Sequence, residues 1–232
     1  MSETRFVDFD GHRVAYRVAG EGPALVVLHL YRRREDVVQL RLLSSRLQVF
    51  EIAPLGFGRS DRVPGYAGEA LTAQILTVLD HHHADRFVVW GYSAGGAMAA
   101  CIARATPRTA GLVCGGYALL GVPTAGAMRQ MDRRLRPDHP SRTLWTWVTR
   151  FDWGAELRAM TCPRLFFWGS EDTSVQMAKR LRRIREEFAD DDIDFVEFPG
   201  VGHEVGGDES LMTDLVVPTV VSWIDRRLGS TW

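Results

Sequence analysis

Short, almost wholly apolar segments alternate with longer mixed segments along most of the chain. Six of the apolar segments have the length of buried strands: residues 23–29, 47–53, 86–91, 109–116, 163–169 and 193–198. The segments between them have the length and spacing of helices, at residues 35–46, 68–83, 94–105, 174–189 and 210–228. Strands that are apolar throughout and alternate with helices are typical of a mostly parallel sheet with helices on both faces. The pattern therefore predicts an α/β fold.

Two segments depart from this rhythm. Residues 12–19 alternate between polar and apolar positions after an Asp10-Gly11 pair, which predicts an antiparallel hairpin at the start of the sheet. Residues 121–160 contain no strand pattern, and their large apolar side chains recur at roughly helical intervals. We expect residues 121–160 to form a short helical cap, with residues 1–120 and 161–232 forming the α/β core.

Composition narrows the class of protein. The 232 residues are 46% hydrophobic and 25% charged, with a net charge of −1, so a nucleic-acid binder driven by phosphate neutralisation is not indicated. The chain has no apolar leader and no apolar run of membrane-spanning length, so we expect no membrane partner. Three widely spaced cysteines, at 101, 114 and 162, indicate buried thiols in a reduced compartment. We expect a cytoplasmic protein.

A serine lies between two glycines where the strand at 86–91 ends, in Gly91-Tyr92-Ser93-Ala94-Gly95. A sharp strand-to-helix turn would hold Ser93 in a strained, exposed position, and glycines two residues before and after it would relieve collisions with the neighbouring backbone. The helix that follows would direct free N–H groups at Ser93. The alternative is an ordinary tight turn with an incidental serine.

A serine nucleophile needs a base and an acid that orients the base. Asp172 follows the strand at 163–169, and His203 lies in a glycine-rich loop after the strand at 193–198. Catalytic groups of open α/β sheets gather at the carboxyl ends of the strands, so Ser93, Asp172 and His203 are expected to converge there. Taken singly, Asp172 could instead cap a helix, and His203 could be a solvated loop residue.

Over nearly its full length the chain resembles the α/β-hydrolase superfamily. The motifs that carry the resemblance are the Ser93 turn, the strand at 25–29 and the loop Gly-Phe-Gly-Arg-Ser-Asp at 56–61. The resemblance implies Ser93 as nucleophile, His203 as general base and acid, and Asp172 as the orienting carboxylate, with Glu171 as a minor rival to Asp172.

The same resemblance implies an oxyanion hole. It would consist of the backbone N–H of Ala94 and the N–H of a residue after His29, either Tyr31 or Leu30. The chain departs from the family pattern at two positions in this region. Leu30 stands where the family usually has glycine, and Ala53 stands where it often has aspartate.

The substrate side of the site has two interpretations. Aromatic residues of the predicted cap, together with the residue before the nucleophile, would form an apolar wall over Ser93: Tyr92, Trp145, Trp147, Phe151 and Trp153. Alternatively, the cap rings hold the cap to the core. Arg32-Arg33-Arg34 is either a basic rim for an anionic substrate or, as we prefer, a solvated turn.

No cofactor and no metal are expected. His81-His82-His83 could suggest a metal site, but adjacent histidines do not share a helix face and no cluster of carboxylates or cysteines supports them. Their position fits the end of a helix, where histidine suits the dipole.

The leading hypothesis is a serine hydrolase that cleaves an ester or thioester of a hydrophobic, for instance aromatic, acyl compound through an acyl-enzyme. The partner would be a small acyl substrate, free or delivered as a coenzyme A or carrier-protein thioester. An acyltransferase on the same three residues, a carbon–carbon bond hydrolase, a lactonase and a non-catalytic ligand-binding protein remain alternatives.

Overall fold

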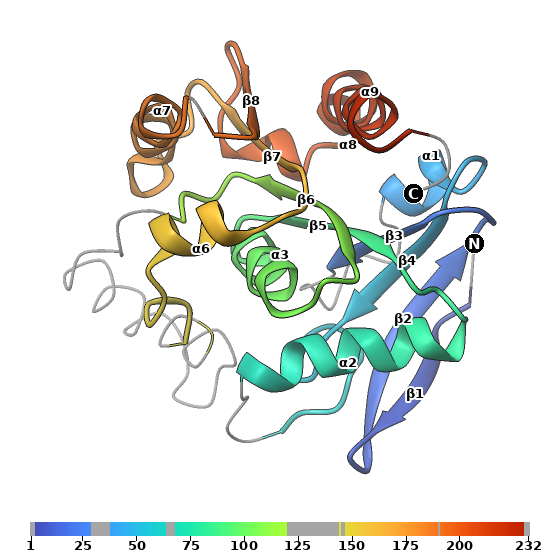
Figure 1. The fold of residues 1–232 in the computed structure, drawn as a ribbon. Coiled ribbons are helices and arrows are strands. Elements are labelled where there is room, and N and C mark those ends of the chain that lie inside the picture. Colours follow the sequence, from blue (N-terminus) through green and yellow to red (C-terminus); the bar gives the residue numbers. More distant parts are fainter. Residues whose placement is uncertain are drawn as a thin grey trace.

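The strands form one mixed sheet in the computed structural model, which describes residues 3–28, 38–63, 68–119, 144, 147–189 and 191–229 (Figure 1). The strand order is β1-β2-β4-β3-β5-β6-β7-β8. Strand β2 pairs antiparallel with β1 and β4, and the other neighbouring strands are parallel. The strands are β1 Arg5–Phe9, β2 His12–Ala19, β3 Ala24–Leu28, β4 Gln48–Ala53, β5 Phe87–Tyr92, β6 Thr109–Gly115, β7 Arg164–Gly169 and β8 Ile193–Phe198. The predicted α/β fold is confirmed.

Helices follow the strands at the predicted places. Their bounds are α1 Val38–Leu43, α2 Gly68–His81, α3 Ala94–Ala105, α6 Trp153–Ala159, α7 Met177–Glu187, α8 Glu209–Leu211 and α9 Val217–Leu228. Short 3₁₀ turns cover Ser174–Gln176 and His203–Gly206, and a π-helical turn at Met212–Val216 joins α8 to α9. Helix α3 has the predicted bounds.

The two faces of the sheet bury two separate apolar clusters. Alternate residues of one strand belong to different clusters, as Val26 and Leu25 of β3 do. Helices α2, α3, α6 and α7 pack on the Val26 side, whereas α1 and α9 pack on the Leu25 side (Figure 1). Because both faces are covered, the central strands are buried along their whole length, as in β6.

The hairpin between β1 and β2 has the predicted turn. Asp10 and Gly11 both have positive φ angles, 52° and 76°, which is the conformation that an Asp-Gly pair favours between two antiparallel strands. The hairpin supplies the antiparallel edge of the sheet.

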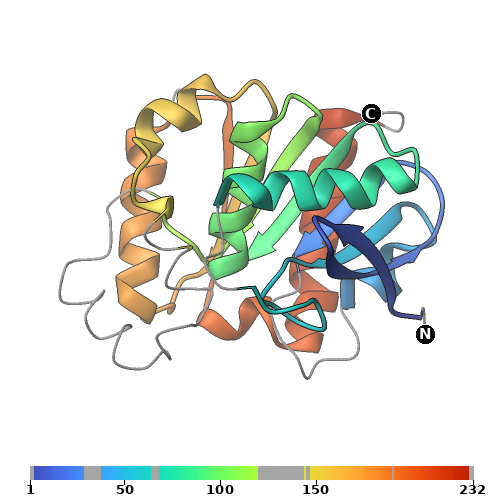
Figure 2. The ribbon, with the colours of Figure 1, turned by 90° about the horizontal axis from the view of Figure 1, so that it is seen from below.

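Only part of the predicted cap can be compared with the structure, because residues 120–143, 145 and 146 lie outside the described residues. From Trp147 onward the chain packs into the core, and α6 lies on the sheet beside α3 (Figure 2). Arg164, at the start of β7, holds the end of α6 against the sheet. Its buried guanidinium donates to the carbonyls of Leu157 at 2.5 Å, Met160 at 2.8 Å and Asp192 at 2.8 Å.

Strands β3, β5, β6, β7 and β8 run parallel, so their carboxyl ends meet at one edge of the sheet, where the arrowheads point in Figure 2. In the described part of the chain, no helix combines the length and apolar character that crossing a membrane requires.

Candidate functional site

Ser93 occupies the turn between β5 and α3 in a conformation that side chains rarely adopt. Its φ of 54° and ψ of −123° place it in the left-handed half of conformational space. Such a residue costs on the order of 1–3 kcal/mol and persists only where its surroundings hold it. Here the Ser93 N–H donates to the Gly115 carbonyl at 2.8 Å, and the Ser93 carbonyl accepts from Gly96 N–H at 2.9 Å. Hydrogen bonds to β6 and to α3 therefore hold the turn in this conformation.

Glycines make this turn possible for a steric reason. A Cβ atom at Gly91 would lie 1.9 Å from the carbonyl oxygen of Gly95, so position 91 has no room for a side chain. Gly96, the residue after Gly95, is also confined: a Cβ there would lie 2.9 Å from the Cys114 sulfur and 3.2 Å from the Tyr117 Cβ. Gly96 thus lets α3 lie close against the end of β6, a role that we had not predicted.

Asp172 and His203 meet Ser93 at the carboxyl edge of the sheet. The Nε2 atom of His203 is 3.2 Å from Ser93 Oγ, and its Nδ1 atom is 2.7 Å from Asp172 Oδ2. The Asp172 side chain is fully buried, while that of His203 is 34% exposed. The other Asp172 oxygen, Oδ1, accepts from Ser174 N–H at 2.9 Å.

This geometry assigns the imidazole tautomer. An ionised carboxylate only accepts hydrogen bonds, so Nδ1 of His203 must carry the proton that faces Asp172. In the neutral ring, Nε2 then has a lone pair directed at the Ser93 hydroxyl. The arrangement can remove a proton from Ser93 and stabilise the resulting imidazolium with a buried negative charge.

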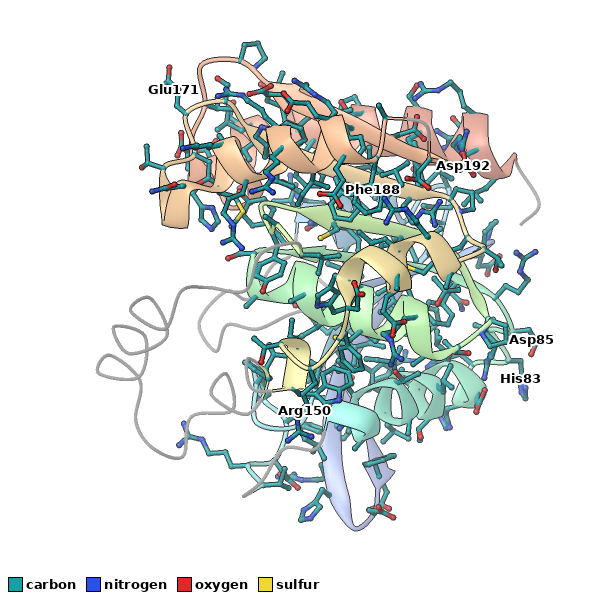
Figure 3. All side chains as sticks on the ribbon, turned by 60° about the vertical axis from the view of Figure 1, so that its left-hand side comes forward. His83, Asp85, Arg150, Glu171, Phe188 and Asp192 are labelled. Atoms are coloured by element: carbon teal, nitrogen blue, oxygen red, sulfur yellow. The ribbon has the colours of Figure 1, made fainter. Side chains whose placement is uncertain are left out.

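Glu171 is not placed to replace Asp172. Its side chain is exposed and points away from the molecule in Figure 3. Its backbone N–H donates to the Val201 carbonyl at 2.9 Å, which ties the segment after β7 to the loop that carries His203. Of the two neighbouring carboxylates, Asp172 is the one that contacts the imidazole.

A second carboxylate, that of Glu204, follows His203 directly in the same 3₁₀ turn. The backbone N–H groups of Gly202 and of Glu204 itself hold the pKa of the Glu204 carboxyl below its usual range, with Gly202 N–H 2.8 Å from Oε1. Glu204 is therefore ionised at neutral pH.

The cysteines do not compete with Ser93 as nucleophiles. All three thiols are buried, and burial raises the pKa of Cys101, Cys114 and Cys162. A buried thiol with a raised pKa stays protonated and unreactive. Ser93 therefore stays the candidate nucleophile at this edge of the sheet.

Half of the predicted oxyanion hole lies within the described residues. Ala94 is the first residue of α3, in the turn where N–H groups have no partner inside the helix. Leu30 and Tyr31 lie outside the described residues, so the second donor stays a prediction.

Tyr92 packs beneath the loop that carries His203. Its hydroxyl donates to the backbone carbonyl of His203 at 2.7 Å, and its ring stacks on Phe167 with centroids 5.8 Å apart. These contacts lie beneath the loop of the candidate base, and a contact of Tyr92 with substrate stays a prediction.

The aromatic residues at the start of α6 and just before it form a packed cluster. The ring centroids of Phe151 lie 5.2 Å from Trp147 and 5.6 Å from Trp153, and the Arg104 guanidinium lies 4.1 Å above the Phe151 ring. Arg104 also pairs with Glu156 of α6, with atoms 2.8 Å and 3.1 Å apart.

This cluster is remote from Ser93. Arg104 stands in the last turn of α3 and Ser93 precedes its first turn, a separation of about 16 Å at the usual rise per residue. The contacts of Phe151 and Trp153 are those of side chains that hold α6 to α3, so the expectation of a wall over Ser93 is not supported for them. Trp145 lies outside the described residues.

The three adjacent histidines are placed as expected. His81 is the last residue of α2, and His82 Nε2 is 3.1 Å from the Tyr16 hydroxyl. Among the described residues, no three His, Cys, Asp or Glu side chains are grouped as a metal ion would require.

Comparisons with known proteins agree with this fold. The sequence model of the alpha/beta hydrolase fold matches residues 27–143. No curated protein sequence matches the chain significantly. Among solved structures, an esterase from Thermogutta terrifontis is 19% identical, with a TM-score of 0.73 over 97% of this chain and 99% of the esterase.

Two further structures have the same architecture. E-2-(acetamidomethylene)succinate hydrolase is 19% identical, with a TM-score of 0.73 over 97% of this chain and all of that chain. A thioesterase domain from the curacin biosynthetic pathway is 15% identical, with a TM-score of 0.68 over 94% of this chain and 99% of the domain. At these identities the likeness is one of fold.

Proposed function

The chain belongs to the α/β-hydrolase fold family, and we propose that it is a serine hydrolase that cleaves an ester or thioester of a hydrophobic acyl compound. The observation that carries this proposal is the hydrogen-bonded line from Ser93 Oγ through the His203 imidazole to the buried Asp172 carboxylate. Each of the three side chains follows the carboxyl end of a different strand.

In the first half of the reaction, Ser93 Oγ attacks the acyl carbonyl carbon while its proton passes to His203 Nε2. The electron pair of the carbonyl moves onto oxygen, where the N–H of Ala94 stabilises the negative charge. Collapse of this intermediate breaks the bond to the leaving alcohol or thiol, which departs with the proton from Nε2.

In the second half, water attacks the Ser93 ester and gives one proton to His203 Nε2. The acid leaves, and the proton returns to Ser93 Oγ. Asp172 stays ionised throughout and stabilises the imidazolium that forms twice in each cycle.

The choice of substrate class is supported by the fold relatives that are named as an esterase and a thioesterase domain. These likenesses are of fold, and they serve to choose the substrates for the test. A series of p-nitrophenyl esters and coenzyme A thioesters with matched acyl chains compares the two leaving groups at constant acyl structure.

The first test is labelling with a fluorophosphonate, which reacts only with an activated serine. We expect one adduct, located at Ser93 by peptide mass, and no adduct in Ser93→Ala. Turnover of the best ester or thioester should fall by about 10⁴-fold or more in that variant. Ser222→Ala, on the exposed side of α9, is the matched control and should label normally.

Two outcomes would overturn the proposal. One is the absence of any adduct at Ser93 in the folded wild-type protein, which would favour a ligand-binding protein of the same fold. The other is turnover near the wild-type level in Ser93→Ala. Product analysis with an added alcohol or amine acceptor separates hydrolysis from acyl transfer, since only transfer yields the acylated acceptor.

A further inference from the structure

The candidate base lies on a loop, further from the end of its strand than its two partners are from theirs. His203 begins a 3₁₀ turn, His203–Gly206, five residues after the end of β8, and its imidazole is 34% exposed. A loop residue of this kind needs an anchor if its Nε2 atom is to stay at hydrogen-bonding distance from Ser93.

Tyr92 supplies such an anchor from the elbow itself. Its hydroxyl donates to the His203 carbonyl at 2.7 Å, and its ring lies 5.2 Å from the His203 imidazole, tilted by 49°. Tyr92 is the last residue of β5 and immediately precedes Ser93. One side chain therefore joins the nucleophile's turn to the base's loop, across 111 positions of sequence.

Three glycines make room for the Tyr92 side chain. A Cβ atom at Gly206 would lie 2.2 Å from Cγ of the ring, one at Gly115 2.6 Å from Cδ2, and one at Gly116 2.7 Å from the hydroxyl oxygen. These glycines come from the end of β6 and from the loop of His203 itself. Together with the stacked ring of Phe167, they leave Tyr92 a closely fitted site.

We infer that Tyr92 is a positioning residue for the reaction: its hydroxyl holds the His203 backbone so that the imidazole stays aligned with Ser93 Oγ. This inference rests on the proposed function. Proton transfer depends steeply on the distance and angle between donor and acceptor, so a loop that moves by about 1 Å can lower the rate by up to about a hundredfold.

A substrate-binding role for Tyr92 predicts a different kinetic result. A residue that contacts substrate changes KM when its hydroxyl is removed. A residue that aligns the base changes kcat and leaves KM alone, because substrate binding does not use the Tyr92–His203 bond.

The decisive variant is Tyr92→Phe, which keeps the ring and removes the hydroxyl. We expect the rate constant of fluorophosphonate labelling at Ser93, and kcat, to fall by roughly ten- to a hundredfold, with KM within about twofold of wild type. Incorporation of 4-aminophenylalanine at position 92 restores an N–H donor on the same ring and should recover most of the lost rate.

Tyr16→Phe is the matched control. The Tyr16 hydroxyl also bonds a histidine, at 3.1 Å from His82 Nε2, but on β2 and away from Ser93. Its removal should leave labelling and kcat unchanged, so a general loss of packing is separated from a loss of alignment. Circular dichroism shows that each variant is folded.

The outcomes separate the two proposals. Labelling of Ser93 in Tyr92→Phe at the wild-type rate overturns the positioning role while the proposed function stands. A rise in KM at unchanged kcat overturns it in favour of substrate contact. Absence of labelling in the wild type overturns the proposed function, and the positioning role with it.

Gly206→Ala tests the packing of the Tyr92 ring by changing its glycine neighbour instead of the tyrosine. Its added Cβ would collide with the Tyr92 ring, so a folded Gly206→Ala protein should lose labelling rate as Tyr92→Phe does. Wild-type labelling in both folded variants excludes the role that we assign to Tyr92.

Discussion

The molecule contains two imidazole–hydroxyl pairs of nearly equal length in very different surroundings. His203 Nε2 lies 3.2 Å from Ser93 Oγ at the carboxyl edge of the sheet, and His82 Nε2 lies 3.1 Å from the Tyr16 hydroxyl beside the antiparallel hairpin. The first pair is the centre of the candidate active site. The second pair is a structural contact between α2's end and β2.

The two imidazole rings differ in their charged neighbours. Nδ1 of His203 faces the buried carboxylate of Asp172 at 2.7 Å, so a positive charge on this ring has a partner. Burial lowers the pKa of His82, and the neighbouring positive charges of His81, Arg5 and His83 lower it further. The rings of Tyr16 and Phe50 also lie edge-on against it, with centroids 5.5 Å and 5.2 Å away.

The comparison shows that a histidine beside a hydroxyl is not by itself a base. What makes one is a buried anion on the opposite side of the ring, which allows the imidazole to accept a proton when the hydroxyl gives it up. Burial and the nearby charge of Arg5 oppose a proton on His82, so His82 stays neutral and supports the fold.

Replacing the two histidines is the strongest test of this difference. His203→Ala should lower kcat by about 10⁴- to 10⁶-fold, because Ser93 then loses its base. His82→Ala should leave kcat within about twofold. Steady-state kinetics on one ester decides the matter, and comparable losses in both folded variants would contradict the assignment.

Removing only the charge at Asp172 should give the next largest effect. Asp172→Asn keeps the size of the side chain but offers an N–H donor to Nδ1, which favours the wrong imidazole tautomer, and kcat should fall by about 10⁴-fold. Asp225→Asn is the control, because Asp225 lies on α9 and forms an exposed ion pair with Arg46. An Asp172→Asn enzyme within tenfold of wild type, measured by burst and steady-state kinetics, is incompatible with the proposed mechanism.

Removing the hydrogen bond between Tyr16 and His82 should lower stability and leave activity unchanged. Tyr16→Phe removes a hydrogen bond from a side chain that is only 3% exposed, so the free energy of unfolding should fall by about 1 kcal/mol. Urea unfolding followed by tryptophan fluorescence measures this loss. Unchanged stability would mean that the His82 contact contributes nothing to the fold.

The smallest expected effect is a pH dependence of stability at His82. Its pKa in the folded state lies below the ordinary value of about 6.5, so the unfolded chain binds a proton more readily. The stabilising contribution of the neutral ring is therefore complete above about pH 6.5 and is lost as the pH falls through the folded-state pKa.

His82→Gln should remove this part of the acid sensitivity. Melting temperatures of wild type and variant at about pH 8 and about pH 5 give the comparison, and the wild type should lose more on acidification. A variant that loses as much as the wild type would show that other groups carry the acid sensitivity.

Much of the fold and the line of three site residues could be predicted because each depends on local pattern. The apolar runs at 86–91, 163–169 and 193–198 mark strands, and a parallel sheet brings whatever follows them to one edge. Ser93, Asp172 and His203 follow from that rule together with their order in the chain.

Contacts between distant segments could not be predicted in the same way. The place of Tyr92 beside Ser93 predicts a contact with substrate but does not identify the partner of its hydroxyl. The pair Gly115-Gly116 and Gly206 were the available signal, since glycines where strands and loops end often make room for a neighbour. The contact between Phe151 and Arg104 was likewise not predictable, because nothing in the spacing of the aromatic residues identifies Arg104 as their neighbour.

Arg164 has a consequence for how this protein could be rebuilt. Its guanidinium fastens the end of α6 to the start of β7 and to the Asp192 carbonyl, and Ala118 N–H is bonded to the Met177 sulfur on the other side of the gap in the described chain. These bonds lie in the described chain on either side of residues 120–143 and do not use that segment. Redesign of residues 120–143 can therefore leave these anchors in place.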